Sequence, residues 1–341
     1  MKGDVRRESS EAPSVAVIVL NWNCWPDTLE CLESLFRLKY PSFEVVVCDN
    51  ASTDGSVERI GQWASNELCI LPASRAMAGF VLPPVVKPSD ILRATEKDRT
   101  PRLTLIQSPS NLGYAAGNNL GLSWALERKF DYAWILNADT VVDPDALDAL
   151  IARMSTSNDA GLCGSLLCYY DAPSKIQEAG GCEAYPLIGL SRRLASDQDR
   201  NFSHPWRRLE ARMGYISGAS CLVSRSFLED VGLMSEDYFL YCEEIDWATR
   251  ARGLYTLSLA EKSLVYHKKG LSTGSKAVGR SRSASSSYYL WRARRRFTQR
   301  YHPLGLVSLF GLGIAASTAR ALSGDVRAAK SILAGVLDRT R

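Results

Sequence analysis

Residues 132–147, Tyr-Ala-Trp-Ile-Leu-Asn-Ala-Asp-Thr-Val-Val-Asp-Pro-Asp-Ala-Leu, say most about the fold of this chain. The apolar run Ala133 to Leu136 predicts a strand that leads directly into Asn137-Ala138-Asp139. The chain then turns at Asp143-Pro144-Asp145 and enters a predicted helix. Ligands of α/β sheets bind outside the carboxyl ends of the strands, where a carboxylate can hold a hard divalent cation. A lone Asp after a strand is common, so four other segments decide how much weight Asp139 carries.

Two more apolar segments extend this pattern of strands and helices. Val15–Leu20 and Phe43–Cys48 are continuous runs rich in β-branched residues, which is typical of strands buried on both faces of a sheet. Each is followed by a polar turn and then by a predicted helix. This order predicts an α/β fold with a mostly parallel central sheet.

Composition limits the classes of protein that need to be considered. The chain has 341 residues, 46% of them hydrophobic, and a formal net charge of +4, which gives no reason to expect a nucleic-acid partner. Its nine cysteines include no Cys-x-x-Cys pair, which predicts reduced thiols in a cytoplasmic protein. Residues 1–11 contain no apolar segment, so we expect no signal peptide. The longest apolar run, residues 304–316, is shorter than the roughly 18–20 residues of a membrane span.

Asp49 ends the second predicted strand as Asp139 ends its own. A carboxylate there can accept hydrogen bonds from a nucleobase imide or a ribose hydroxyl. For the neighbouring Ser52 and Asp54, helix capping is as good an explanation as binding. Residues 111–119, rich in glycine and asparagine, are predicted to form a turn that either lets a nucleotide approach the backbone or is only a tight turn. No G-x-G-x-x-G follows the first strand, so the dinucleotide fingerprint is absent.

The segment Glu243-Glu244-Ile245-Asp246 places three carboxylates within four residues, directly after the apolar Phe239-Leu240-Tyr241. Carboxylates that are buried close together raise at least one pKa, which suits a general base. Acidic residues are also favoured at a helix N-terminus by the helix dipole, and both explanations can hold at once.

His267 ends a predicted strand and is one of three histidines in the chain. A single histidine is usually structural, but this position makes it a candidate ligand, and imidazole with a carboxylate suits Mn²⁺ as well as Mg²⁺. Lys268, Lys269 and the serine- and glycine-rich segment 270–287 follow. They are interpreted either as a lid over phosphates or as a linker.

Together these segments resemble the family 2 glycosyltransferases, nucleotide-sugar-dependent enzymes of the GT-A fold, over about residues 13–270. The subgroup that the chain resembles is the bacterial rhamnosyltransferase-like enzymes that build cell-surface polysaccharides. Five motifs in order carry the resemblance: Val17-Ile-Val-Leu-Asn-Trp-Asn, Val47-Cys-Asp-Asn-Ala-Ser-Thr-Asp-Gly-Ser, Asn111-Leu-Gly-Tyr-Ala-Ala-Gly-Asn-Asn-Leu-Gly, Leu136-Asn-Ala-Asp-Thr and Phe239-Leu-Tyr-Cys-Glu-Glu-Ile-Asp-Trp.

The resemblance implies a role for each candidate site residue. Asp139 matches the last Asp of the DxD motif and is expected, with His267, to bind a divalent metal, Mg²⁺ or Mn²⁺. Glu244 matches the second acid of the family's Glu-Asp pair and is the expected base, with Glu243 and Asp246 as its catalytic neighbours. The residues expected to bind the donor are Asn21, Asn23, Asp49, Gly113, Asn118, Asn119 and Asn137. Two positions depart from the family pattern, because Asn137 and Glu244 stand where aspartates are expected.

The implied reaction is a single displacement that inverts the anomeric carbon. The expected donor is a nucleoside-diphosphate sugar, with rhamnose on thymidine diphosphate as the leading choice from family likeness alone. The expected acceptor is a hydroxyl of a glycan or polyprenyl-linked molecule. Two other classes stay open, namely a nucleotidyltransferase that makes sugar nucleotides and a non-catalytic nucleotide-sugar-binding relative. The first would be expected to carry a glycine-rich, basic phosphate loop after the first strand, where Asn21-Trp22-Asn23 stands.

The expected organisation places one catalytic domain between a tail and a helical extension. Its parts are a disordered tail (1–12), the glycosyltransferase domain (13–270, with a donor half at about 13–140 and an acceptor half at about 141–270), a proline-rich insertion (69–101), and a loop with basic and amphipathic helices (271–341). Residues 292–300 carry five arginines and no acid, and the apolar run 304–316 follows. Whether residues 292–316 make a peripheral contact with the inner face of the cell membrane or pack on the catalytic domain stays open.

Overall fold

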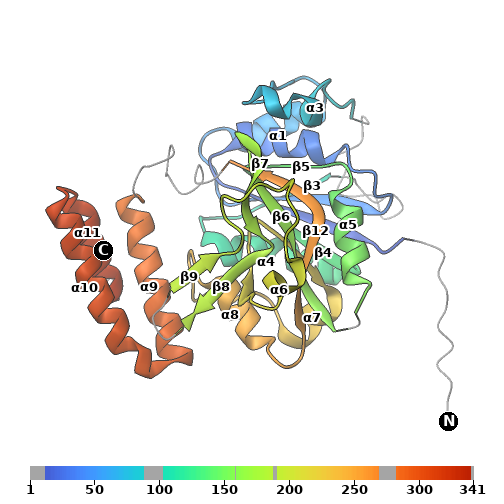
Figure 1. The fold of residues 1–341 in the computed structure, drawn as a ribbon. Helices are drawn as coiled ribbons and strands as arrows, with labels where there is room; N and C mark the ends of the chain where they lie inside the picture. The colour runs from blue at the N-terminus through green and yellow to red at the C-terminus, as the bar shows by residue number, and fades with distance from the viewer. Residues whose placement is uncertain (1–11, 88–102, 158, 187–189, 269–281, 339–341) are drawn as a thin grey trace, which may run out of the picture.

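The computed structural model describes residues 12–87, 103–157, 159–186, 190–268 and 282–338. A large sheet has the strand order β3-β2-β1-β4-β11-β6-β12-β5, with β7 paired to β6, and a small sheet has the order β10-β8-β9 (Figure 1). The strands are β1 (Val15–Asn21), β2 (Phe43–Asp49), β3 (Leu103–Gln107), β4 (Tyr132–Asn137), β5 (Thr140–Val142), β6 (Ala160–Tyr169), β7 (Ala172–Ala179), β8 (Gly181–Tyr185), β9 (Leu190–Arg193), β10 (Tyr215–Ile216), β11 (Ser220–Ser224) and β12 (Thr256–His267). The helices are α1 (Trp25–Leu35), α2 (Ser56–Ala64), η1 (Arg75–Met77), α3 (Ala78–Val81), α4 (Gly113–Glu127), α5 (Ala146–Met154), α6 (Trp206–Glu210), α7 (Arg225–Val231), α8 (Glu243–Arg250), α9 (Ala284–Tyr301), η3 (Pro303–Gly305), α10 (Leu306–Leu322) and α11 (Val326–Val336).

The first four strands of the sheet are parallel, as the order of strands and helices predicts. β1 pairs in parallel with β2 and with β4, and β2 pairs in parallel with β3. The register sets Asn21 opposite Asp49 and Leu20 opposite Asn137, so the polar groups that end these strands share one edge of the sheet. This edge is where ligands of α/β sheets bind.

The other half of the sheet is mixed. β11 runs antiparallel to both β4 and β6, while β12 runs parallel to β6 and antiparallel to β5. The β12–β5 register pairs His267 with Thr140, and the Lys268 amide donates to the Asp139 carbonyl at 2.9 Å. Strand pairing alone therefore brings His267 beside Asp139, although the two are far apart in sequence.

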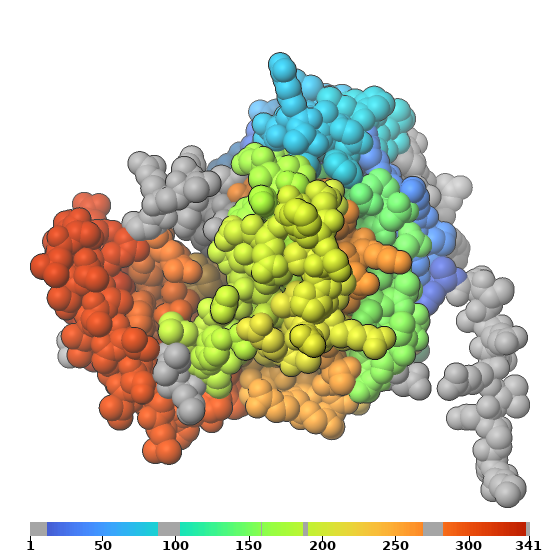
Figure 2. Space-filling view, in the orientation of Figure 1, coloured from blue at the N-terminus to red at the C-terminus, as the bar shows by residue number. Residues whose placement is uncertain are grey.

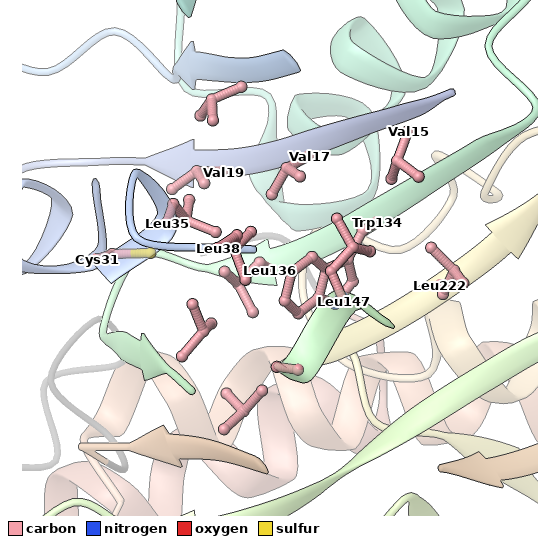
Figure 3. Close-up of a cluster of buried hydrophobic side chains, with 14 of the residues drawn as sticks. Val15, Val17, Val19, Cys31, Leu35, Leu38, Trp134, Leu136, Leu147 and Leu222 are labelled. Atoms are coloured by element: carbon pink, nitrogen blue, oxygen red, sulfur yellow. The ribbon is translucent and has the colours of Figure 1, made fainter. Parts of the chain in front are cut away.

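Side chains alternate between two cores because neighbouring residues of a strand point to opposite faces. Val15, Val17 and Val19 of β1 face one core, which Figure 3 shows with Trp134 and Leu136 of β4. Ala16 and Ile18 of β1 face the other core, under α4. Strands buried on both faces account for the continuous apolar runs of the sequence.

The glycine-rich segment 111–119 is mostly helix, whereas the sequence predicted a turn. Gly113, at φ +83°, opens α4, and the next residues form its first two turns. Two glycines of this helix lie against β1: a Cβ on Gly117 would stand 2.6 Å from the Leu20 side chain, and one on Gly121 would stand 2.5 Å from Ile18. These glycines therefore serve a close approach of helix to sheet.

The proline-rich segment is anchored to helix α1 by polar contacts along the part that the structure describes. Glu33 of α1 is fully buried, and its carboxylate pairs with Lys87 at 2.9 Å and accepts from the Val85 amide and the Trp63 indole, both at 2.8 Å. Residues 88–101 of the predicted insertion lie outside the described residues, as do residues 1–11 of the predicted tail and residues 271–281 of the predicted loop.

Helices α9, α10 and α11 form a lobe at one side of the molecule, with α9 next to β8 and β9 (Figures 1 and 2). Arg292, Arg295 and Arg296 of α9 all pair with Asp338, at 2.7 to 3.4 Å. Much of the predicted basic stretch is therefore used to hold α9 to the end of α11. Among the described residues, one helical segment, Pro303–Leu322, is long and apolar enough to cross a membrane by length and composition. It extends beyond the apolar run noted in the sequence.

Candidate functional site

A cavity of about 270 Å³ opens at the carboxyl ends of β1 and β4. Six of the predicted site residues line it: Gly113, Asn137, Asp139, Glu243, Glu244 and His267. A larger cavity of about 840 Å³ lies at the opposite ends of the strands, next to Ser14, which precedes β1. Two of its charged side chains, Asp131 and Arg225, pair with each other at 3.2 Å. We therefore take the smaller cavity, which holds the predicted site residues, as the candidate functional site.

Asp139 and His267 form a buried pair in this cavity. His267 Nε2 lies 3.1 Å from Asp139 Oδ1, but within the described residues neither carboxylate oxygen of Asp139 has an aligned hydrogen-bond partner. The other ring nitrogen, Nδ1, lies 2.6 Å from Gln177 Oε1, which can only accept, so Nδ1 carries a proton as the amide is assigned. In the neutral ring Nε2 then presents a lone pair to the carboxylate.

Electrostatics of the pair favour an ionised Asp139 carboxylate facing a positive charge. Burial opposes ionisation of Asp139, but His267 and Lys268 outweigh it and hold the pKa of this carboxyl below its usual range. Burial likewise opposes a charge on His267, and the facing carboxylate still raises the pKa of the imidazole. The donor set, one carboxylate oxygen and one imidazole nitrogen, fits Mn²⁺ or Mg²⁺.

Two protein ligands leave most of a metal's coordination sphere to other groups. Across the described ranges, no cluster of three or more His, Cys, Asp or Glu side chains could hold a metal ion. A divalent cation bound to Asp139 and His267 would therefore take its remaining oxygens from water and from a bound ligand. That arrangement is common for metals that act on phosphate groups.

Lys268 is not among the residues that line this cavity, although the sequence allowed it to be part of a lid over phosphates. Its Nζ donates to Asp27 at 2.6 Å and to Glu30, both on α1. These contacts hold the end of β12, where His267 lies, to helix α1. Lys269 and the first part of the predicted lid lie outside the described residues.

Glu243 and Glu244 begin α8 and enter the cavity from the side opposite β1. The two residues before them, Tyr241 and Cys242, have φ values of 73° and 68°. Non-glycine residues pay for left-handed backbone with strain, and such strain concentrates at functional sites. This tight turn aims the first turn of α8 at the cavity.

Burial perturbs both carboxyl groups. It raises the pKa of Glu244 to about 7, with a smaller contribution from the nearby Glu178 and with opposing backbone hydrogen bonds. Burial and the Glu244 charge raise the pKa of Glu243 well above its usual range. These shifts favour the protonated form of Glu243 and bring the pKa of Glu244 close to neutral pH.

A second cavity, of about 440 Å³, meets the first at Glu244. Ser217 and Tyr241 also line both cavities. The second cavity lies between the small sheet, α8 and α9, and Glu178 of β7 forms part of its wall. The half-buried Glu244 thus stands in the wall that the two cavities share.

Asn21, Asn23 and Asp49 lie beside the first cavity and hold its strand-end loops. Asn21 Nδ2 donates to Asp49 Oδ1 at 2.6 Å and to Ser52 Oγ at 3.0 Å. The other Asp49 oxygen accepts from the Ser52 amide at 3.0 Å. Asn23 accepts from the Thr53 amide at 2.7 Å.

Asn118, Asn119 and Asp246 do not line this cavity. Asn118 Nδ2 donates to the Tyr114 carbonyl within α4. The Asn119 amide bonds to both the carbonyl and the amide of Met234, which fixes the loop before α8. Asp246 accepts from Tyr238, from Arg250 and, at 2.9 Å, from Tyr301 of α9, so it holds the C-terminal helices to α8.

The structure adds residues that the sequence analysis did not select. Trp22, 43% exposed, and Tyr114 line the first cavity beside Asn50. Asn50 bonds to Asn111, to the Gly113 carbonyl and to the Leu112 amide, and so joins two of the predicted motifs. An exposed tryptophan directly after a strand was the signal in the sequence that could have identified Trp22.

Comparison with solved structures confirms the predicted GT-A fold. The mannosyltransferase PcManGT from Pyrobaculum calidifontis, in complex with GDP-Man and Mn²⁺, matches with a TM-score of 0.51 and 17% identity, covering 97% of this chain and 77% of that one. GalNAc-T7, with UDP, GalNAc and Mn²⁺, matches with a TM-score of 0.55 and 15% identity, covering 87% and 51%.

The family model described as Glycosyl transferase family 2 matches residues 16–75 and 88–232, so the chain belongs to that family, as its motifs predict. It is similar to N-acetylglucosaminyl-diphospho-decaprenol L-rhamnosyltransferase of Mycobacterium tuberculosis, with 29% identity over 229 residues, 59% of this chain and 73% of the relative. The low-salt glycan biosynthesis hexosyltransferase Agl10 of Haloferax volcanii is 25% identical over 148 residues, 43% and 45% of the two chains.

Proposed function

We propose that this protein transfers a sugar from a nucleoside-diphosphate donor in the first cavity to a hydroxyl group of a glycan or lipid-linked acceptor in the second. The position of Glu244 in the wall shared by the two cavities carries the proposal. A group that touches both substrates, with its pKa raised to about 7, is suited to take a proton from one as it attacks the other.

In this proposal the donor binds along the strand-end edge of the sheet. Asp139 and His267 would hold a divalent cation, which when bound supplies Lewis-acid stabilisation of the diphosphate leaving group. Asn137 and Gly113 line the pocket at the same edge, and Trp22 offers an aromatic face. Four residues around the pocket would shape it from outside: Asn21 and Asp49 at the ends of β1 and β2, Asn23 in the loop after β1, and Asn118 in α4.

The chemical step assigned to Glu244 is general-base catalysis. Its carboxylate takes the proton of the acceptor hydroxyl as the hydroxyl oxygen bonds to the anomeric carbon. The bond from that carbon to the donor phosphate oxygen breaks on the opposite side, and its electron pair leaves with the nucleoside diphosphate. Attack from the side of Glu244 inverts the configuration of the anomeric carbon.

The donor sugar is proposed to be rhamnose, on the strength of the similarity to the mycobacterial L-rhamnosyltransferase. The test is a panel of nucleoside-diphosphate sugars, including thymidine-diphosphate rhamnose and GDP-mannose, incubated with the protein and Mn²⁺ or Mg²⁺. Nucleoside diphosphate release identifies the donor, and NMR of the product reports the anomeric configuration. A product with retained configuration would refute the single displacement, and no release from any donor would favour a binding protein without turnover.

Transfer is expected to depend on pH through Glu244. The base acts only in its ionised form, so kcat/KM should fall as the pH drops below about 7, the value to which burial raises the pKa of this carboxyl, and should level off above it. Initial rates at constant ionic strength across this range test the expectation. A profile that stays flat between about pH 5.5 and 8 would contradict it.

Gly218→Ala is expected to damage catalysis more than stability. A Cβ there would stand 2.5 Å from Tyr114 Oη and 2.7 Å from Glu244 Oε1, both at the ends of side chains that can move aside. Displacing the base by about 1 Å can lower a rate by about 10²-fold. Measured kcat should fall with little change in melting temperature. Gly61→Ala is the control, since its Cβ meets nothing within 4 Å, and equal rates for both variants would contradict the placement of Glu244.

We further propose that the protein works in the cytoplasm, at the inner face of the cell membrane. All nine cysteines are free thiols, as in proteins of reducing compartments. The C-terminal lobe exposes large apolar side chains, with Leu304 89%, Val307 81% and Ile314 58% exposed. Exposed apolar surface of this kind marks a membrane or protein contact, and α10 adjoins the helix that walls the second cavity.

The double variant Val307→Glu/Ile314→Glu is therefore expected to lose binding to phospholipid vesicles while it keeps hydrolysis of a soluble donor. Burying a charge in an apolar interface is unfavourable. Co-sedimentation with vesicles measures the loss. Leu254→Glu, at an equally exposed leucine outside the lobe (62% exposed), is the control. Failure of the unmodified protein to sediment with vesicles would show that the lobe makes no membrane contact.

A further inference from the structure

We propose that the second cavity recognises a phosphate or diphosphate group of the acceptor through Arg193, Arg282 and Arg294, and that this contact presents the acceptor hydroxyl to Glu244. The inference rests on the proposed function and adds to it the chemical class of the acceptor. It assigns acceptor specificity to three residues outside the family motifs.

The three arginines come from two distant parts of the chain. Arg193 ends β9 in the small sheet, Arg294 lies in the middle of α9, and Arg282 lies just before α9 begins. All three line the 440 Å³ cavity that also holds Glu178 and Glu244. This size is within the range of pockets that bind small molecules.

Among the charged side chains of this cavity, burial is greatest at the acidic Glu178 and least at the basic Arg282. Glu178 is buried and Glu244 half-buried, whereas Arg193 and Arg294 are half-buried and Arg282 is exposed. An acceptor with a hydroxyl at one end and an anion at the other would match this order. A neutral glycan would leave the guanidinium groups without a partner of opposite charge.

Neighbouring arginines differ from these in having carboxylate partners. Arg292 and Arg295 of α9 pair with Asp338 at 2.7 and 3.3 Å. Within the described residues, neither Arg193 nor Arg294 has an ion pair or a side-chain hydrogen bond, although the Arg294 guanidinium stacks 5.1 Å from the Trp291 ring. Each therefore keeps its N–H donors available, and the planar guanidinium matches phosphate oxygens in pairs.

The electrostatic state of Arg294 agrees with an anion at this place. Burial lowers the pKa of Arg294, and the like charge of Arg282 lowers it further. Arg193 is close enough to Glu178 to lower the pKa of that carboxyl, which burial raises overall, yet they form no ion pair. A bound anion would relieve the repulsion between the arginines.

The test compares two acceptors that share one sugar, a neutral alkyl glycoside and the same sugar on an alkyl diphosphate. Arg193→Gln and Arg294→Gln should each raise KM for the diphosphate acceptor about tenfold or more, since a charge-assisted hydrogen bond is lost. The rate with the neutral glycoside and the hydrolysis of donor alone should be unchanged. Arg295→Gln, on the same helix but paired with Asp338, is the control and should keep the KM.

Calorimetric titration with the alkyl diphosphate acceptor and with inorganic pyrophosphate gives a readout that needs no turnover. Weaker binding of both by the two variants supports the anion site, and binding of the alkyl diphosphate alone shows that the lipid-linked form is required. Unchanged KM and unchanged titrations, or equal losses with both acceptors, would overturn the inference. If no donor is turned over but the titrations behave as expected, the proposed function fails while the anion site stands.

Discussion

Replacement of Glu244 by glutamine is expected to lower the rate of sugar transfer by about 10² to 10⁴-fold, the usual contribution of a general base. Glutamine keeps the size and shape of the side chain but cannot take the acceptor proton. Donor binding should be retained, because Asp139 and His267 hold the other end of the first cavity. The measurements are kcat with both substrates saturating and the donor Kd from titration.

Glu243→Gln is the matched comparison for this variant. Burial and the neighbouring Glu244 charge raise the pKa of Glu243 well above its usual range, which favours the neutral form of this side chain. A neutral amide should replace a neutral carboxylic acid with a loss of no more than about tenfold, since no proton transfer to this group is required. If Glu243→Gln is the more damaging change, the base is Glu243. If both variants keep full activity, neither carboxylate is the base.

Asp139→Asn is expected to abolish the stimulation of donor turnover by Mg²⁺ or Mn²⁺ and to lower turnover by at least about 10²-fold, because metal stabilisation of a leaving group contributes several kcal/mol. The change removes one of two candidate protein ligands and leaves the size of the side chain unaltered. Neither oxygen of Asp139 has an aligned hydrogen-bond partner within the described residues, so the amide disrupts little of the local structure. Titration of Mn²⁺ in the presence of nucleoside diphosphate measures the affinity directly.

Asn137→Asp is the companion experiment. Asn137 lines the same cavity where the family pattern has an aspartate, so the variant adds a carboxylate to the site and should tighten metal binding. A large loss of metal affinity in Asn137→Asp would show that the site requires the amide of Asn137 for a role other than binding the metal. Metal stimulation that survives intact in Asp139→Asn would place the cation elsewhere, and the roles assigned to Asp139 and His267 would both be withdrawn.

Many of the elements could be predicted because their signals are local. The strands β1 and β2 agree with prediction to within one residue at each end, since burial on both faces of a sheet requires continuous apolar runs. The segment 111–119 was predicted as a turn because glycine and asparagine favour turns, yet its glycines allow close packing of α4 on β1. Composition alone cannot separate these two uses of glycine.

The region 170–212 shows where local signals fail. It contains β7, β8, β9 and α6. Strand β9 (Leu190–Arg193) is exposed except at its last residue and lacks the alternation that identifies a strand. The wall of the second cavity, with Glu178 and Arg193, therefore could not be predicted from the sequence.

The sequence by itself determined the family, much of the order of strands and helices, and the position of Asp139 after its strand and of Glu244 after an apolar segment, because motif order and hydrophobic periodicity are properties of contiguous residues. Tertiary structure alone decided which of these groups meet. The register of β12 against β5 brings His267 to Asp139, and the turn at Tyr241 and Cys242 aims Glu244 at the shared wall. The tertiary structure also shows that Asn119 and Asp246 form hydrogen bonds that hold neighbouring segments of the protein together. Such pairings depend on contacts between residues that are distant in sequence, and local sequence patterns do not report these contacts.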